Sequence, residues 1–185
     1  VLDQETKTCY TLCMKLTLRL HLLPTTDQHT ALRETMRLCN EAATYAAAKG
    51  FAAGVYGQVS LHHLAYYEIR ERFGLSSQLA VRAIAKAVEC FQRDKTVSPV
   101  FRADGAVCYD QRVLSFHGLN SASLWAIGGR VEVPFLCGPY QEARQGRIQG
   151  QADLVLRDGV FYLLCTIDMP EDTPIEPQDV MGVDL

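Results

Sequence analysis

A faultless alternation of apolar and polar residues near the N-terminus most constrains the fold: TLCMKLTLRLHL, residues 11–22. Every even position carries leucine or methionine, and this period of two predicts a β-strand with one buried face. Pro24 ends the pattern. A lone strand cannot bury its apolar face, so this strand must pair with strands from elsewhere in the chain.

Three helices are predicted after this strand. Thr25 and Gln28 form a capping pair for the first, and Gly50 is expected to end it. The second, LHHLAYYEIRERF, is expected to begin at Ser60 and to end at Gly74.

The third predicted helix, from Ser76 or Ser77 to about Lys95, is strongly amphipathic. Its apolar stripe consists of Leu79, Ala80, Ala83, Ile84, Ala87, Val88 and Phe91. The opposite face carries Gln78, Arg82, Lys86, Glu89 and Arg93.

Short β-rich runs follow Pro99: AVCYDQRVLSF, SLWAI, GRVEVPFL, GRIQGQADLVL and VFYLLCTI. Asp158-Gly159 predicts a hairpin turn, because this pair accepts the positive φ that a tight turn needs. The first strand then pairs with these later ones, and the helices are inserted between them. We therefore expect an α+β fold, with the helices inserted into a small antiparallel barrel or sandwich.

The charge is unevenly distributed. Six acids and no Lys or Arg lie beyond Gly159, so a chain with a net charge of −3 has +3 over residues 1–158. Thirteen of its eighteen cations are arginine, which suits bidentate phosphate contacts, although an ordinary solvated surface explains the same counts.

The cysteines and the apolar runs exclude several classes of protein. Seven scattered cysteines without a Cys-x-x-Cys pair indicate reduced core thiols rather than zinc ligands or disulfides. No apolar run approaches the roughly 20 residues of a membrane span, and the N-terminus lacks the form of a secretory signal. Because Val1 is not methionine, we expect residues before it.

The C-terminal part combines three features in order: the hairpin ADLVLRDGVFYLLCTIDMP, the Pro- and acid-rich segment PEDTPIEP, and a new strand, VMGVDL. With the helical insertion, this order resembles the TnpB (insertion-sequence OrfB) family of transposon-encoded RNA-guided DNA endonucleases, relatives of the type V CRISPR effectors. The order covers nearly the whole chain, whereas residues 153–169 and 180–185 resemble the family in local motif.

The resemblance implies a domain organisation. Residues 8–24 and 99–169 would form the wedge, an oligonucleotide-binding-like β-barrel, and residues 25–98 the helical recognition domain. Residues 170–179 would be a linker, and residues 180–185 the first strand of a RuvC nuclease domain with an RNase H-like fold.

The same resemblance assigns Asp184 as a catalytic residue and a ligand of Mg²⁺. A RuvC site gathers several carboxylates around two divalent cations. The other ligands and the family's zinc ribbon would lie beyond Leu185, so these 185 residues are expected to be inactive alone and to hold no zinc.

Guide RNA and double-stranded target DNA are the implied partners, with the guide supplying most of the specificity by base pairing. The DNA-binding candidates are Ser77, Gln78, Arg82 and Lys86 on the third helix, and Tyr56. Gln and Arg can read base edges and Lys can hold phosphate, but a solvated helix face is the alternative.

Arginines from the first helix and from the β region are the RNA-binding candidates. They are Arg33, Arg37, Arg102, Arg112, Arg130, Arg144 and Arg147, with Asn40 beside the first two. Arg144 and Arg147 fall in QEARQGRIQG, which we expect to be a loop.

Two other functions are compatible with the sequence. One is a nuclease-dead RNA-guided repressor or the protomer of a dimer, and the other is an α+β protein-interaction domain in which GVDL is coincidental. The first hypothesis implies a prokaryotic cytoplasmic protein without a membrane segment, associated with the nucleoid when bound.

Overall fold

A computed structural model describes residues 13–170 of the chain. Its strands are β1 (Cys13–Leu22), β2 (Val107–Asp110), β3 (Leu114–His117), β4 (Ser121–Ala126), β5 (Gly129–Leu136), β6 (Ile148–Arg157) and β7 (Val160–Pro170). Its helices are α1 (Thr26–Ala53), α2 (Gln58–Phe73), α3 (Ser77–Arg93) and α4 (Pro139–Gln145).

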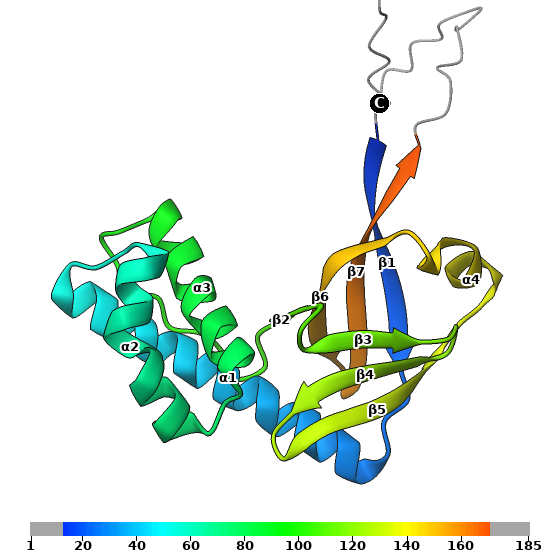
Figure 1. Cartoon of the computed structure of the whole chain (residues 1–185), viewed down its shortest axis with the longest axis horizontal. Helices are drawn as coiled ribbons and strands as arrows, with labels where there is room; N and C mark the ends of the chain where they lie inside the picture. The colour runs from blue at the N-terminus through cyan, green and yellow to red at the C-terminus, as the bar shows by residue number, and fades with distance from the viewer. Residues whose placement is uncertain (1–12, 171–185) are drawn as a thin grey trace, which may run out of the picture.

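The described strands form one antiparallel sheet in the order β2-β6-β7-β1-β5-β4-β3, which curls into a nearly closed barrel (Figure 1). β1 lies between β7 and β5, so the first strand pairs with the last strands of the chain, as its alternation requires. Leu18, Leu20 and Leu22 are buried. The α+β prediction is therefore confirmed, with a barrel rather than a sandwich.

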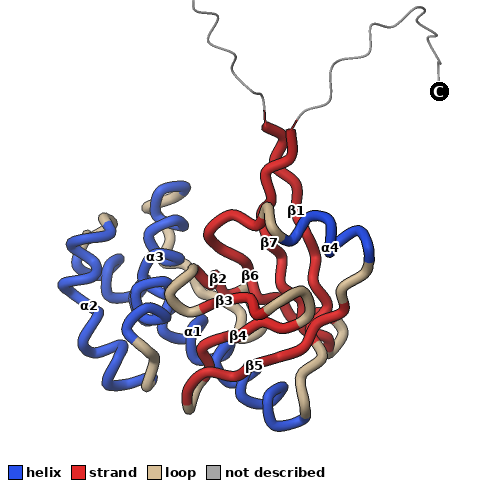
Figure 2. The backbone as a smooth tube through the Cα atoms, turned by 45° about the vertical axis from the view of Figure 1, so that its right-hand side comes forward, coloured by secondary structure: helices blue, strands red, loops and turns tan. Residues whose placement is uncertain are grey.

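The helices α1, α2 and α3 are inserted between β1 and β2 and lie at one side of the barrel (Figures 1 and 2). All seven predicted apolar positions of α3 are buried, and they pack against α1 and α2. The N-terminal part of α1 also contacts the barrel: Gln28 Nε2 donates to Glu132 O (2.8 Å), and Ile127 N donates to Thr35 Oγ1 (2.8 Å). Helix α1 therefore belongs to both parts of the fold.

Two helix boundaries differ from the sequence predictions. The Thr25–Gln28 capping box is present, but α1 continues through Gly50 and ends at Gly54, whose φ of 66° is left-handed. Gly50 is needed for close approach, because a Cβ there would lie 2.7 Å from Val55 O. Helix α2 starts after Gly57 rather than at Ser60, and its predicted end at Gly74 is confirmed.

The β region differs from the prediction in two places. The run AVCYDQRVLSF is split into β2 and β3, because Asp110 turns the chain: its carbonyl accepts from Val113 N (3.0 Å) and its carboxylate from Arg112 N (3.0 Å). The predicted loop QEARQGRIQG instead contains most of helix α4, which begins at Pro139, and the first residues of β6. The Asp158-Gly159 hairpin is confirmed, and both residues have positive φ.

Candidate nucleic-acid interface

The segment from Arg102 to Ala106 joins the helices to the barrel, and Asn40 on α1 fixes it. The Asn40 side chain is fully buried, and its Nδ2 donates to Gly105 O (2.8 Å) and Ala103 O (3.4 Å). Asn40 was a candidate for polynucleotide contact; its burial shows that it is instead a structural residue.

Lys86 of α3 completes this junction. Its Nζ donates to Asn40 Oδ1 (2.6 Å) and to Ala106 O (2.7 Å). Burial lowers the pKa of this ammonium group. A Cβ at Gly105 would lie 3.0 Å from Asn40 Oδ1, so a side chain at this position would crowd the junction.

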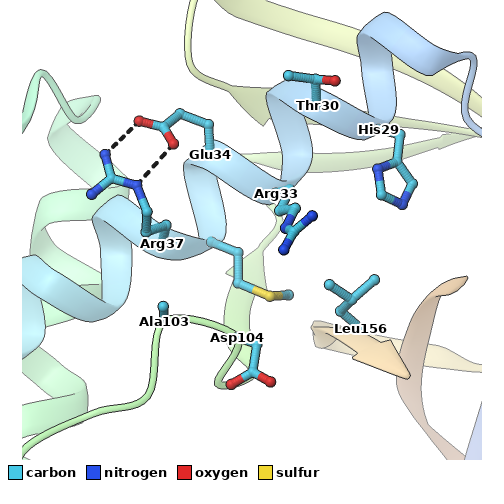
Figure 3. A pocket seen from close by; sticks show the side chains of 9 residues that line it. His29, Thr30, Arg33, Glu34, Arg37, Ala103, Asp104 and Leu156 are labelled. Atoms are coloured by element: carbon cyan, nitrogen blue, oxygen red, sulfur yellow. Dashed lines mark hydrogen bonds and ion pairs between the residues drawn. The ribbon is translucent and has the colours of Figure 1, made fainter. Parts of the chain in front are cut away.

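A cavity of about 510 Å³ lies between α1, the Ala103–Asp104 backbone and Leu156 of β6 (Figure 3). Arg33 lines this cavity and forms no ion pair with a described residue. Its side chain is exposed, and its charge contributes to the lowered pKa of the Asp104 carboxyl at the same cavity.

Two other candidate arginines, Arg37 at this cavity and Arg102 just before Ala103, have acidic partners. Arg37 pairs with Glu34 (2.6 Å) and Glu41 (2.5 Å), as Figure 3 shows for Glu34. Arg102 pairs with Asp104 (2.7 Å), and this pairing lowers the pKa of the Asp104 carboxyl. Their positive charge is largely compensated within the protein.

Three side chains of the polar face of α3, those of Gln78, Arg82 and Lys86, are half-buried, whereas Glu89 and Arg93 on the same face are exposed. Gln78 donates to the Asp110 carboxylate and accepts from Arg112 Nη1 (3.2 Å). Arg82 Nη2 contacts Cys108 Sγ and donates to Gln151 Oε1 (2.9 Å). These side chains connect α3 to the barrel, so any DNA contact would compete with these bonds.

Arg82 and Lys86 also line a second cavity, of about 360 Å³, together with Cys39 and Asp153. The Arg82 Nε is buried and has no hydrogen-bond partner among the described residues. Burial raises the pKa of the Cys39 thiol to about 12, so this thiol is protonated at neutral pH and acts as a core residue.

The predicted DNA-binding residues do not form one cluster. Ser77 is exposed at the start of α3. Tyr56 packs edge-on against Phe91 near the other end of this helix, with ring centroids 5.0 Å apart. Fourteen residues separate Ser77 from Phe91, which corresponds to about 21 Å along the helix axis.

Arg112 and Arg130 extend the polar contacts from α3 across the barrel. Arg130 Nη2 donates to Arg112 O (2.9 Å), and Arg130 Nη1 to Ser123 Oγ (3.2 Å). The Arg130 guanidinium lies over the Trp125 ring, 5.8 Å from its centroid. Neither arginine forms an ion pair within residues 13–170.

Arg144 and Arg147 lie at the end of α4 and just after it. The Arg144 guanidinium stacks on Tyr140, 3.9 Å from the ring centroid, and Arg147 is exposed. Gln145 between them is buried and donates to Gly118 O (2.8 Å). Sequence reasoning missed Gln145, because its partner lies 27 residues away and no local pattern marks the contact.

The predicted magnesium ligand, Asp184, lies outside the described residues, as do the linker and the final strand. Within residues 13–170, no group of three His, Cys, Asp or Glu side chains could hold a metal ion. No helix in this range is both long and apolar enough to cross a membrane. No protein-family model matches the chain, and no curated protein matches it significantly.

Proposed function

We propose that this chain is the guide-RNA-binding and target-DNA-binding portion of an RNA-guided DNA endonuclease of the TnpB type. The observation that carries the proposal is a helical insertion in a β-barrel, with arginines on both parts that form no ion pair with a described residue. Arg33, Arg112 and Arg130 come from distant parts of the sequence and form no ion pair with a described residue. Such guanidinium groups suit the phosphate backbone.

In this proposal the barrel is the wedge domain, the helices form the recognition domain, and Asp184 is the first Mg²⁺ ligand of a RuvC domain. Mg²⁺ would supply the activated water for phosphodiester hydrolysis in the complete nuclease domain. The residues of this chain bind and orient the polynucleotides, and we expect no cleavage by them alone. We expect the protein in the prokaryotic cytoplasm, on the nucleoid when bound to DNA.

A second candidate function is protein interaction, including dimerisation of a nuclease-dead repressor. The outer face of α2 favours it, because Tyr67 is 80% exposed and Val59 is 69% exposed. Exposed apolar and aromatic side chains on one helix are typical of partner surfaces, although Tyr67 could also stack on a base.

RNA retention across a salt series tests the proposal. The chain is expressed alone and with the non-coding RNA encoded beside its gene, and the retained RNA is measured after washes of rising ionic strength. We expect the logarithm of the binding constant to fall linearly with the logarithm of the salt concentration. Retention that does not depend on salt, or no RNA at all, would contradict the proposal; a salt-resistant dimer in light scattering would then support protein interaction.

Single substitutions sharpen this test. Arg33→Ala and Arg130→Ala should each reduce the slope of the salt dependence by about one, the contribution of one phosphate contact. Arg157→Ala is the matched control, because this exposed arginine lies at the β6–β7 hairpin, and neither cavity at the junction includes it. If the wild type and all three variants have the same slope, Arg33 and Arg130 do not contact phosphate groups of the bound RNA.

A further inference from the structure

A serine, a histidine and a glutamate contact one another on one face of the sheet formed by β3, β4 and β5. Ser115 and His117 are two residues apart on β3, so their side chains point to the same face. Glu132 of β5 shares this face, because Ser123 of β4 pairs with both Ser115 and Glu132. Ser115 Oγ lies 3.5 Å from His117 Nε2, and His117 Nδ1 lies 3.3 Å from Glu132 Oε1. The imidazole therefore links a hydroxyl to a carboxylate.

The carboxylate determines the tautomer of this imidazole. Ser121 Oγ donates to Glu132 Oε1 (2.5 Å), and this bond, together with the one from His117, lowers the pKa of the Glu132 carboxyl. The ionised carboxylate can only accept, so it favours the tautomer with hydrogen on His117 Nδ1. Nε2 is then an acceptor that faces the Ser115 hydroxyl, which is the arrangement of a nucleophile with its general base. Such contacts are often long before a substrate binds, as the 3.5 Å separation is here.

A cation and a cavity adjoin the Ser115 hydroxyl. Arg130 Nη1 lies 3.4 Å from Ser115 Oγ, and Arg130 Nη2 donates to Arg112 O (2.9 Å). A guanidinium fixed beside the nucleophile can stabilise the negative oxygen that forms when the hydroxyl attacks a carbonyl carbon. Ser115 also lines a cavity of about 340 Å³, whose wall includes the apolar side chains of Leu114 and Ile148. This volume is at the lower end of the range of roughly 300–1,000 Å³ for small-molecule sites, so it suits a short acyl chain.

We propose that Ser115, His117 and Glu132 hydrolyse short-chain carboxylic esters through an acyl-serine intermediate. Ser115 Oγ attacks the carbonyl carbon while His117 Nε2 takes up its proton, and Nε2 then gives this proton to the alcohol that leaves. Nε2 next takes a proton from water, the hydroxide adds to the acyl carbon, and the proton returns to Oγ as the bond to Ser115 breaks and the carboxylic acid leaves. Glu132 stays ionised and is a positioning residue, which orients the imidazole and stabilises its positive charge. This inference is independent of the proposed function, because no polynucleotide takes part.

The exposure of the site determines how much each residue contributes. The His117 and Glu132 side chains are 54% and 59% exposed. A substrate can therefore reach the imidazole, but water screens the Glu132 charge and reduces its effect. We expect the loss of the Ser115 hydroxyl to lower the rate more than the loss of the Glu132 charge.

Hydrolysis of p-nitrophenyl acetate by the full 185-residue chain tests the inference. We expect Ser115→Ala and His117→Ala to lower kcat/KM by about 100-fold, and Glu132→Gln to lower kcat by about 10-fold with KM unchanged. His63→Ala is the matched control and should keep the wild-type rate, because this exposed histidine lies on α2, away from the site. After treatment of the wild type with a fluorophosphonate, mass spectrometry should show one covalent adduct, on Ser115 and not on Ser121.

The outcomes separate a serine nucleophile from simpler explanations. Free imidazole also hydrolyses activated esters, so activity that persists in Ser115→Ala but is lost in His117→Ala would overturn the role of Ser115. Equal rates for the wild type and all the variants would overturn the whole site. The adduct is measured on the wild type, so an unmodified Ser115 overturns the proposal even where a substitution unfolds the chain. Salt-sensitive retention of RNA, which tests the proposed function, is unaffected by either result.

Discussion

Replacing Asn40 with leucine should destabilise the protein by about 3 kcal/mol, because Asn40 holds the segment that joins the helices to the barrel. Leucine has a similar shape but leaves Gly105 O without the 2.8 Å bond from Nδ2. A carbonyl left unpaired away from water costs about 1–3 kcal/mol. Lys86 Nζ also loses its 2.6 Å bond to Oδ1, which adds about 1 kcal/mol since Nζ keeps its bond to Ala106 O.

Thermal unfolding followed by circular dichroism measures this effect. For a chain of this length, a loss of about 3 kcal/mol lowers the Tm by roughly 6–12 °C. Asn120→Leu is the matched control: Asn120 is exposed, and its backbone carbonyl, which accepts from Phe135 N, is unaffected by the substitution. This control should change stability by less than about 0.5 kcal/mol.

A double-mutant cycle with Lys86→Met separates the Asn40–Lys86 bond from the remaining effects. The two substitutions should be non-additive by about 1 kcal/mol, because removing the ammonium also removes the group that Asn40→Leu leaves underbonded. Additive effects, or an Asn40→Leu variant as stable as Asn120→Leu, would refute the assignment of Asn40 as the residue that fixes the junction.

Two further predictions concern α1 and α3. Gly50→Ala should destabilise the protein by about 2 kcal/mol, measured by urea denaturation, because the new Cβ would lie 2.7 Å from Val55 O. The sign is opposite to the usual effect, since alanine normally stabilises a helix interior by about 1 kcal/mol relative to glycine. Gly57→Ser is the control: Gly57 is the N-cap of α2 and a Cβ there meets nothing, so this substitution should be neutral or slightly stabilising. A stabilising effect of Gly50→Ala would contradict the close approach of Val55 O to Gly50. Since burial lowers the pKa of Lys86 in the folded state, the unfolded state binds more protons at pH values between the lowered pKa and the usual 10.5. The stability of the wild type relative to Lys86→Met should therefore rise as the pH approaches 10.5, and a constant difference across this range would show that Lys86 is not desolvated.

The sequence predicts those parts of the fold that depend on local periodicity. The alternation in β1 and the apolar stripe of α3 each predict one buried face. The structure buries the whole stripe of α3 and, in β1, Leu18, Leu20 and Leu22, whereas Met14 at the start of the strand is exposed. The Asp158-Gly159 turn is equally local, because it depends on the φ values of two adjacent residues. Helix ends are harder to predict, since glycine serves two purposes in α1: Gly54 ends the helix, whereas Gly50 allows close approach of other elements.

Most of the candidate interface depends on contacts that local patterns do not determine. The spacing of Gln78, Arg82 and Lys86 identifies one face of a helix, but it does not show that the barrel covers this face. That depends on where β2 and β6 lie, because Gln78 contacts Asp110 and Arg82 contacts Gln151. Arginine counts likewise do not distinguish Arg33 from Arg37, whose charge two glutamates compensate.

The barrel is not closed between β2 and β3, the two ends of its sheet, because β2 has only four residues. This strand ends at Asp110, whose two hydrogen bonds to the following turn direct the chain away from β6. If β2 continued for two or three more residues, it would pair with Gly150 and Ile148 and occupy the cavity of about 340 Å³ that lies between β3 and the start of β6. This cavity therefore depends on the turn at Asp110 as much as on the residues that line it.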